Sequence, residues 1–258
     1  MRGGGWQVAI AVLRRTVIHT YKNPAIIIPS LAFPLVFLLA FAGGLSAVSN
    51  VPGFTFAAGY TAFQFVFVFL QMAAFGGIFT GYRLAEDYES GFARRLMLGA
   101  PQRIGIVVGY LLAGLVRFAF IGVLLWALAL LTGMDVKGSL LDIVGLVALG
   151  ALINVACSLW TIGLAFRYQS VDIGSFMQTP VFVLLFLAPV YVPLALLTGW
   201  LKGAASVNPL TLIIDAGRGF ISGDPTKVLY AFAASLAIGG LMWIWATRQM
   251  KRAEAGVR

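Results

Sequence analysis

The stretch NPAIIIPSLAFPLVFLLAFAGGLSAVSNVPGFTFAAGYTAFQFVFVFLQMAAFGGIFTGY, residues 23–82, contains no Asp, Glu, Lys or Arg. A membrane-spanning helix needs about 20 apolar residues, so this run is too long for one crossing and long enough for two. The segment SNVPGF, residues 49–54, interrupts it with Pro and Gly, which are typical of a tight loop. We therefore predict two spans, at about 24–46 and 56–82.

The rest of the chain has the same apolar character. It has 258 residues, of which 60% are hydrophobic and only 10% are charged, whereas a soluble domain has roughly 25% charged residues. The sequence therefore predicts an all-α integral membrane protein, with one transmembrane domain over residues 1–258. Further apolar runs predict four more spans, six in all, at about 104–132, 140–166, 173–199 and 227–247.

Basic residues divide unequally between the two sides of these predicted spans. If the N-terminus lies inside, thirteen Lys and Arg fall in inside segments, and four fall outside, at Lys137, Lys202, Arg218 and Lys227. Cytoplasmic loops are the ones enriched in Lys and Arg. We therefore predict a multi-pass protein of the cytoplasmic (inner) membrane with both termini in the cytoplasm. The same distribution explains the net charge of +9, so nucleic acid is not an expected partner.

The N-terminal segment, residues 1–23, has the pattern of an amphipathic helix. Apolar residues recur at helical spacing, at Trp6, Ile10, Leu13, Val17 and Tyr21. The opposite side is polar and basic, with Gln7, Arg14, Arg15 and Lys22. Such a helix can lie in the membrane interface, in contact with lipid headgroups. The alternative is a basic tail held near anionic lipid.

The segment EDYESGFARRLMLGAPQR, residues 86–103, carries an unusual order of charges between two apolar runs. Acids come first, Gly91 allows a sharp change of direction, and FARRLML predicts a short amphipathic helix that ends before Pro101. One interpretation is a charged cytoplasmic loop, 83–103, that only sets topology. The other is a docking surface for a cytoplasmic partner, which also explains the acids and the Gly and Pro punctuation.

Glu86–Arg103 resembles the segment after the second span in the ABC-2 type transporter permeases, where an acidic stretch runs into Gly, an Arg-Leu-rich helix, Pro and Arg. The later segment NPLTLIIDAGRGF, residues 208–220, is similar to that family's Asn-Pro-Leu-Thr segment. The chain is most similar to exporter subunits of the daunorubicin-resistance kind, over its whole length. It departs from the family pattern after Gly91, where Phe92, Ala93 and Arg94 replace a Thr and an acid, and Pro101 comes one residue late.

The resemblance implies the permease subunit of an exporter for a hydrophobic or amphipathic substrate, such as a drug, lipid or glycolipid. Its coupling element, onto which an ATPase docks, would comprise Glu86, Asp87, Glu89, Gly91, Phe92, Arg94, Arg95, Leu96, Pro101 and Arg103. The interface helix would be a second cytoplasmic contact, through Trp6, Arg14 and Arg15. Two ATPase copies and a second permease, as a homodimer or with a sibling, would complete the transporter.

ATP is expected to bind elsewhere, because the chain has no G-x-x-x-x-G-K-[ST] motif. ATP and Mg²⁺ would bind to the partner ATPase, and this chain would hold no cofactor. Its one cysteine, Cys157, and its one histidine, His19, offer neither an internal disulfide nor a metal-ligand cluster.

The region before the last span is rich in proline, at Pro180, Pro189, Pro193 and Pro209. A helix does not run straight through Pro189 and Pro193, so we predict an external re-entrant or interfacial helical hairpin at 189–222. The residues expected to shape it are Asn208, Pro209 and Arg218. Either a gate for the substrate or a cap that seals a dimer fits this pattern.

Polar residues inside the predicted spans are candidates for a substrate pathway, at Gln64, Gln71 and Arg117. An intramembrane base is costly and suggests function, although a structural ion pair or snorkelling also explains Arg117. Glutamines within spans more often hold helices together. Gly77, Gly81, Gly105 and Gly109 are spaced so that helices can approach closely.

Two other classes of protein remain as alternatives. A membrane-embedded enzyme needs acids, bases, nucleophiles or metal ligands at one depth, and the chain has only one His, one Cys and nine acids. We therefore predict that it is not an enzyme. A secondary transporter or a channel that does not use ATP is the alternative; it would show paired intramembrane charges or an internal repeat, and neither is found.

Overall fold

The computed structural model describes residues 3–44, 54 and 56–255, and the predicted loop at 49–54 lies outside this part except for Phe54. The described residues form helices and turns without any strand, as the all-α prediction requires. The α-helices are α1 Gly3–Lys22, α2 Pro24–Gly44, α3 Gly59–Glu89, α4 Phe92–Gly99, α5 Ile104–Leu131, α6 Leu140–Tyr168, α7 Gly174–Phe186, α8 Gly199–Val207, α9 Pro209–Ser222 and α10 Val228–Ala255.

Four of these helices are long and apolar enough to cross a membrane, namely α3, α5, α6 and α10. Shorter apolar segments occur at Ser30–Phe41 in α2 and at Val171–Phe186, which comprises the one-turn helix η2 Val171–Ile173 and α7. The integral membrane character is therefore supported, and the count of six spans stays a prediction.

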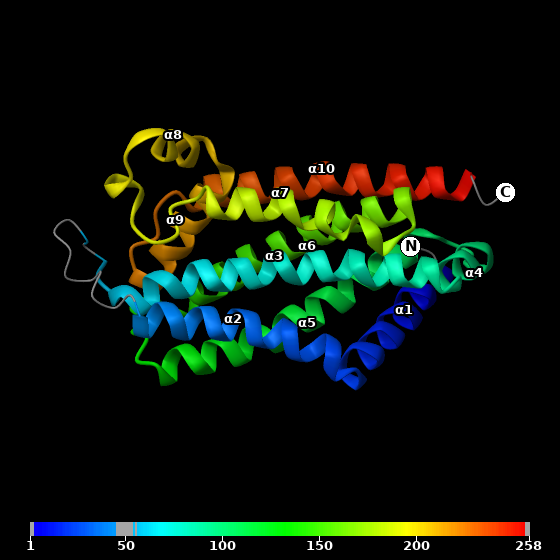
Figure 1. The fold of residues 1–258 in the computed structure, drawn as a ribbon, viewed down its shortest axis with the longest axis horizontal. Helices are drawn as coiled ribbons and strands as arrows, with labels where there is room; N and C mark the ends of the chain where they lie inside the picture. The colour runs from blue at the N-terminus through cyan, green and yellow to red at the C-terminus, as the bar shows by residue number, and fades with distance from the viewer. Residues whose placement is uncertain (1–2, 45–53, 55, 256–258) are drawn as a thin grey trace.

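The long helices run side by side, and the short elements gather at the two ends of the bundle (Figure 1). One end, called the α4 end here, holds α4, the last residues of α3 and the C-terminal part of α10. The helix α1 crosses the bundle at an angle near this end. The opposite end holds α8 and α9.

The helix α3 is the centre of the bundle. Every residue from Ala62 to Ile78 is buried, and α3 contacts α2, α4, α5, α6, α7 and α9. Five of the six phenylalanines of α3, at Phe63, Phe65, Phe67, Phe69 and Phe75, are buried within the protein, and Phe79 is exposed. By contrast, few residues of α10 are buried.

Small residues and polar groups hold α3 against α6. Asn154 Nδ2 donates to the Ala73 carbonyl over 2.9 Å, and Thr161 Oγ1 donates to the Gly77 carbonyl over 3.1 Å. An added Cβ at Gly77 would lie only 2.6 Å from the Asn154 oxygen. The close approach therefore depends on glycine, as is common between membrane helices.

The predicted span at 173–199 is wrong at its far end, because α7 ends at Phe186. Beyond it the chain is irregular up to α8, except for the one-turn helix η3 Leu194–Leu196. Pro189 and Pro193 account for this early end, since proline lacks a backbone N–H and fixes its own φ. The two helices α8 and α9 follow within the segment predicted as a hairpin.

The predicted loop at 83–103 also differs from the structure in its first part. The helix α3 continues to Glu89, so Glu86, Asp87 and Glu89 lie on its last turns rather than in a loop. Ser90 and Gly91 then turn the chain, and α4 begins at Phe92. The acids are thereby held at defined positions around a helix.

Candidate functional site

Asp87 is the central charge of the α4 end, and its side chain is only 1% exposed. It accepts two hydrogen bonds from the Arg15 guanidinium, from Nη1 over 2.7 Å and from Nη2 over 2.8 Å. Arg83 Nη2 donates to it over 2.7 Å, and the Tyr110 hydroxyl donates to it as well. One carboxylate thus joins α1, α3 and α5.

Arg15 connects this cluster to α4. Its guanidinium lies 3.7 Å from the centre of the Phe92 ring, within the range of a cation–π contact. Burial opposes the charge of Arg15, and its hydrogen bonds and attraction to Asp87 outweigh this effect, so the pKa of Arg15 is raised above its usual value. The guanidinium therefore stays charged and holds α1 beside the start of α4.

The other two acids of this segment have different surroundings. Glu86 is exposed and pairs with Arg83 over 2.8 Å on the same helix. Glu89 accepts from Ser170 Oγ over 2.9 Å and from the Val171 backbone N–H over 2.8 Å. Glu89 thereby fixes the connection between α6 and η2 to the end of α3.

The end of α4 is tied to α5 and α10 by Arg103. Its Nε donates to the Met97 carbonyl over 2.8 Å, and its guanidinium forms an ion pair with Glu254 of α10. These bonds use Arg103 inside the molecule, so it serves to position α4.

The remaining predicted docking residues lie on α4 or directly after it, and they differ in exposure. Ala93 and Met97 are its buried residues, and Phe92 and Leu96 are half-buried. Arg94, Arg95 and Pro101 are exposed, and Leu98 is 66% exposed. The short helix therefore presents two arginines and a leucine outward.

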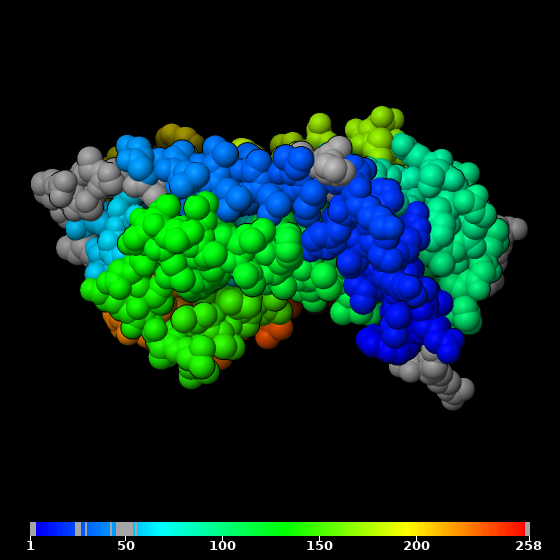
Figure 2. Space-filling view, turned by 90° about the horizontal axis from the view of Figure 1, so that it is seen from below, coloured from blue at the N-terminus to red at the C-terminus, as the bar shows by residue number. Residues whose placement is uncertain are grey.

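The helix α1 packs against α5 through a face of small residues. This face differs from the stripe of larger apolar residues that begins at Trp6. Gly5, Ala9 and Val12 are buried against α5, where a Cβ at Gly109 would lie 2.7 Å from Val12 Cβ. Trp6 is 50% exposed on another side. Figure 2 shows the blue α1 beside α4 with its outer surface uncovered. The exposed apolar side chains of α1, such as Trp6, are thus available to a membrane interface. The interface role of Trp6, Arg14 and Arg15 stays a prediction, and the Arg15 guanidinium lies against Asp87 and Phe92.

Gly91 adopts a left-handed conformation, with φ of 72°, at the turn between α3 and α4. We expect Gly91→Ala to destabilise this turn by about 1–2 kcal/mol, because an L side chain disfavours that region. Unfolding of the purified protein by SDS in mixed micelles measures the change. Gly99→Ala is the matched control: its Cβ would meet nothing within 4 Å, and equal losses for both variants would contradict the argument.

Arg117 lies in the middle of α5 and is 7% exposed. Its Nη2 donates to the Gly76 carbonyl and, over 3.2 Å, to Thr80 Oγ1, both on α3. It also lines a cavity of about 200 Å³, which we call the α2–α7 cavity; its other lining residues are Ser30, Phe33, Pro34, Met72, Phe75, Gly76, Phe79, Ile121 and Gln178.

The two glutamines predicted for a pathway lie along α3 and are buried. Gln64 Nε2 donates to the Tyr60 hydroxyl over 2.6 Å. Within the described part, neither polar atom of the Gln71 side chain has a hydrogen-bond partner. Phe67 and Phe75, one helical turn on either side of Gln71, contact Phe186 and Phe182 of α7. Gln71 therefore lies on the side of α3 that faces α7.

The residues predicted for the external hairpin fasten α9 to the bundle. Asn208 accepts from the Leu210 N–H over 3.0 Å as the N-cap of α9, and Pro209 is its first residue. The Arg218 guanidinium stacks 3.4 Å from the centre of the Phe63 ring and donates to the Val190 carbonyl over 3.1 Å. Arg218 thus links α9 to α3 and to the irregular segment.

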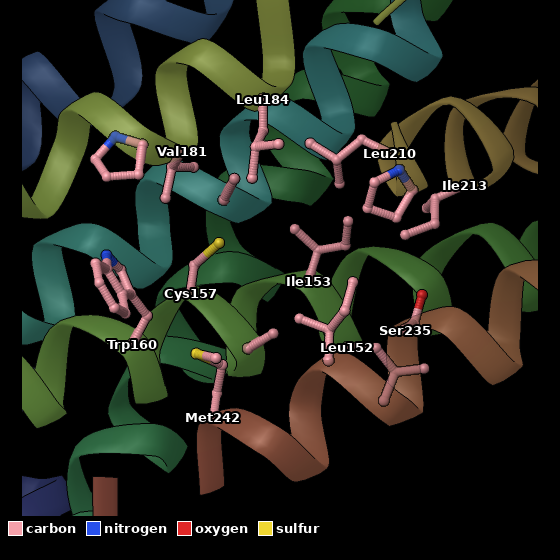
Figure 3. A pocket seen from close by; sticks show the side chains of 15 residues that line it. Leu152, Ile153, Cys157, Trp160, Val181, Leu184, Leu210, Ile213, Ser235 and Met242 are labelled. Carbon is pink, nitrogen blue, oxygen red and sulfur yellow. The ribbon is translucent and has the colours of Figure 1, made fainter. Parts of the chain in front are cut away.

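A second cavity, of about 250 Å³, lies among α6, α7, α9 and α10. Figure 3 shows side chains from these helices around it, including Cys157 and Trp160 of α6, Val181 of α7 and Met242 of α10. Its lining is almost entirely apolar. A hydrocarbon or aromatic molecule is the chemistry that such a cavity accepts.

Sequence reasoning did not identify Arg83 and Tyr110 as partners of Asp87. Arg83 counted only toward topology, and Tyr110 is one aromatic residue in a long apolar run. The spacing of four between Arg83 and Asp87 is a signal for an ion pair on a helix, but it became relevant only once α3 was known to continue past Tyr82.

The fold and these sites define an integral membrane protein that encloses cavities between its helices and presents a short basic helix at one end. The family model for the ABC-2 type transporter matches residues 7–221, so this chain belongs to the ABC-2 type transporter family. A curated relative, "Putative transport permease ycf38" of Pyropia yezoensis, is 26% identical over 215 residues, which cover 81% of this chain and 72% of the relative. The resemblance seen in the sequence is confirmed, and the family is one of transport permeases.

Proposed function

We propose that this chain is the transmembrane permease subunit of an ABC exporter, driven by a separate ATPase that docks on the α4 end. The observation that carries the proposal is the outward surface of α4, where Arg94, Arg95 and Leu98 are exposed. An exposed leucine beside two cations offers the apolar anchor and the complementary charge that a docking partner needs.

The internal contacts of the same end support a coupling role. Asp87 joins α1, α3 and α5, and Arg103 joins α4 to α10. A displacement of α4 would therefore reach the Asp87 cluster through the contact of Phe92 with Arg15, and α10 through Arg103. The roles of the ten predicted residues divide accordingly. Five would face the ATPase: Glu86, Arg94, Arg95, Leu96 and Pro101. The other five would position α4: Asp87, Glu89, Gly91, Phe92 and Arg103.

The cargo that fits the two cavities is hydrophobic or amphipathic, such as a drug, a lipid or a glycolipid. Aromatic and aliphatic side chains dominate both linings. In this proposal, the α4 end and both termini face the cytoplasm, ATP and Mg²⁺ bind to the ATPase, and two ATPases serve a pair of permease subunits. The gathering of Arg94, Arg95, Arg167 and Arg252 near α4 supports this orientation.

Co-purification tests the docking role. A tagged wild-type permease, expressed with its candidate ATPase, is expected to retain the ATPase, and Arg95→Glu/Leu98→Asp is expected to lose at least about 90% of it, since loss of a central anchor costs 2 kcal/mol or more. Lys202→Glu, which reverses one exposed basic residue on α8, is the control for the charge reversal at Arg95 and should behave as wild type.

Two outcomes would contradict the proposal. Equal retention by the folded double variant would remove α4 from the docking site. Failure of the wild type to retain any ATPase would favour a transporter or channel that is not coupled to ATP.

A further inference from the structure

Arg117 is a buried cation for which the described residues provide no carboxylate. None of the ion pairs in the described part includes it. Its hydrogen bonds go to a carbonyl and a hydroxyl of α3, and its Nε has no partner there. A charge inside a membrane protein is normally paired with an opposite charge or placed beside a water-filled cavity. Among the described residues, this positive charge is faced by the Phe79 ring, whose centre lies 5.7 Å from the guanidinium carbon, and by no carboxylate.

The α2–α7 cavity puts this charge within reach of the membrane. Phe33 of α2 and Phe79 of α3 line the cavity and are also exposed on the surface of the bundle. The cavity is consequently bordered by side chains of the outer surface of the bundle. The polar groups in its lining are those of Arg117, Gln178 and Ser30, and the rest is mainly aromatic and aliphatic.

The position of Arg117 along the bundle suits a headgroup. Its partner residues Gly76 and Thr80 precede Arg83 by seven and three positions on α3, which corresponds to about 5–10 Å at 1.5 Å per residue. A smaller cavity of about 10 Å³ lies on its other side and is lined by Thr16, Thr20, Arg83 and Tyr110 among others. That volume holds about one water molecule. Arg117 thus stands between a polar recess at the α4 end and an apolar cavity.

We propose that Arg117 binds the anionic headgroup of an amphipathic molecule, a carboxylate or a phosphate, whose apolar body lies between Phe33 and Phe79 and extends toward lipid. A guanidinium matches either anion through charge-assisted hydrogen bonds. The inference rests on the proposed function only in treating this molecule as cargo, because binding itself requires no ATPase. It narrows the substrate class from hydrophobic or amphipathic molecules to amphipathic anions.

Equilibrium binding to the purified permease, without any ATPase, tests the site. The probes are dansyl-undecanoate and its neutral amide in a non-ionic detergent, followed by dansyl fluorescence. The wild type is expected to bind the carboxylate about tenfold more tightly than the amide, as a charge-assisted hydrogen bond predicts. Arg117→Gln is expected to abolish this preference, and Arg117→Lys to keep part of it.

Controls separate the site from general attraction to a basic protein. Arg248→Gln removes an exposed arginine of α10 and should keep the full preference. Gln178→Trp fills the cavity without changing Arg117 and should weaken carboxylate binding, so the proposal remains testable if Arg117→Gln does not fold. Equal binding of the two probes by the wild type, or an unchanged preference in folded Arg117→Gln, would overturn it.

A competition experiment identifies the source of the headgroup once the preference is established. Displacement of the probe by phosphatidylglycerol, and not by phosphatidylcholine, assigns the site to an anionic membrane lipid. If neither lipid displaces the bound probe, the site is assigned to a diffusible amphipathic anion. Because these assays contain no ATPase, they can succeed or fail independently of the co-purification that tests the exporter proposal.

Discussion

Asp87→Ala is expected to release α1 from the bundle and to lower the free energy of unfolding by about 3 kcal/mol. Removing this carboxylate leaves the buried Tyr110 hydroxyl without its acceptor and leaves Arg83 with only the partly exposed Glu86 as its ion-pair partner, and breaking a buried ion pair is costly. The value is at the lower end of the range for broken buried pairs, because the side chain of Arg15 is 35% exposed and can regain water.

Two measurements follow this change. Unfolding by SDS in mixed micelles reports the free energy, and limited trypsin digestion reports the release of α1, because trypsin cleaves after Arg14 and Arg15. Cleavage should become markedly faster in Asp87→Ala, and Asp87→Asn, which keeps the shape without the charge, should lie between this variant and wild type.

The matched control is Glu86→Ala, one position earlier on the same helix. The Glu86 side chain is 48% exposed and pairs only with Arg83 among the described residues. Exposed pairs contribute at most about 1 kcal/mol, so digestion of α1 should be unchanged. A folded Asp87→Ala protein that resists trypsin as well as wild type would show that α1 is held mainly by its contact with α5.

Gly77→Leu is expected to separate α3 from α6 and to prevent the bundle from forming its native packing. Even an added Cβ would lie 2.6 Å from the Asn154 oxygen and 2.7 Å from the Ser158 nitrogen, both of them backbone atoms. Overpacking costs about 1–3 kcal/mol where neighbours can yield, and two helical backbones yield less than side chains do. We expect loss of the monodisperse folded species in size-exclusion chromatography.

Gly240→Leu on α10 is the control for this substitution. A Cβ at Gly240 meets nothing within 4 Å, so the same change should leave folding intact. Similar behaviour of the two variants would mean that the close contact of α3 with α6 does not determine the packing. Gly77→Ala, which adds only the Cβ, should give an intermediate loss of stability.

The local features of the α4 end could be predicted from the sequence because they depend on single residues. Gly91 and Pro101 mark a turn and a helix end through their own backbone chemistry, and α4 occupies the segment between them. The sequence did not predict that the Asp87 side chain points inward while that of Glu86 points outward. The reason is that two partners of Asp87 are distant in sequence: Arg15 lies 72 positions earlier and Tyr110 lies 23 positions later.

The class of this protein follows from its composition: apolar runs of sufficient length and the distribution of arginine indicate an all-helical membrane protein. The packing of the helices was needed to show that α3 is the buried centre, that α7 ends at Phe186 and that Arg117 meets the α2–α7 cavity. The difference arises because the surroundings of a membrane helix are lipid rather than water. Lipid tails are as apolar as leucine, so hydrophobicity locates a span but does not distinguish the face that packs against protein from the face that meets lipid.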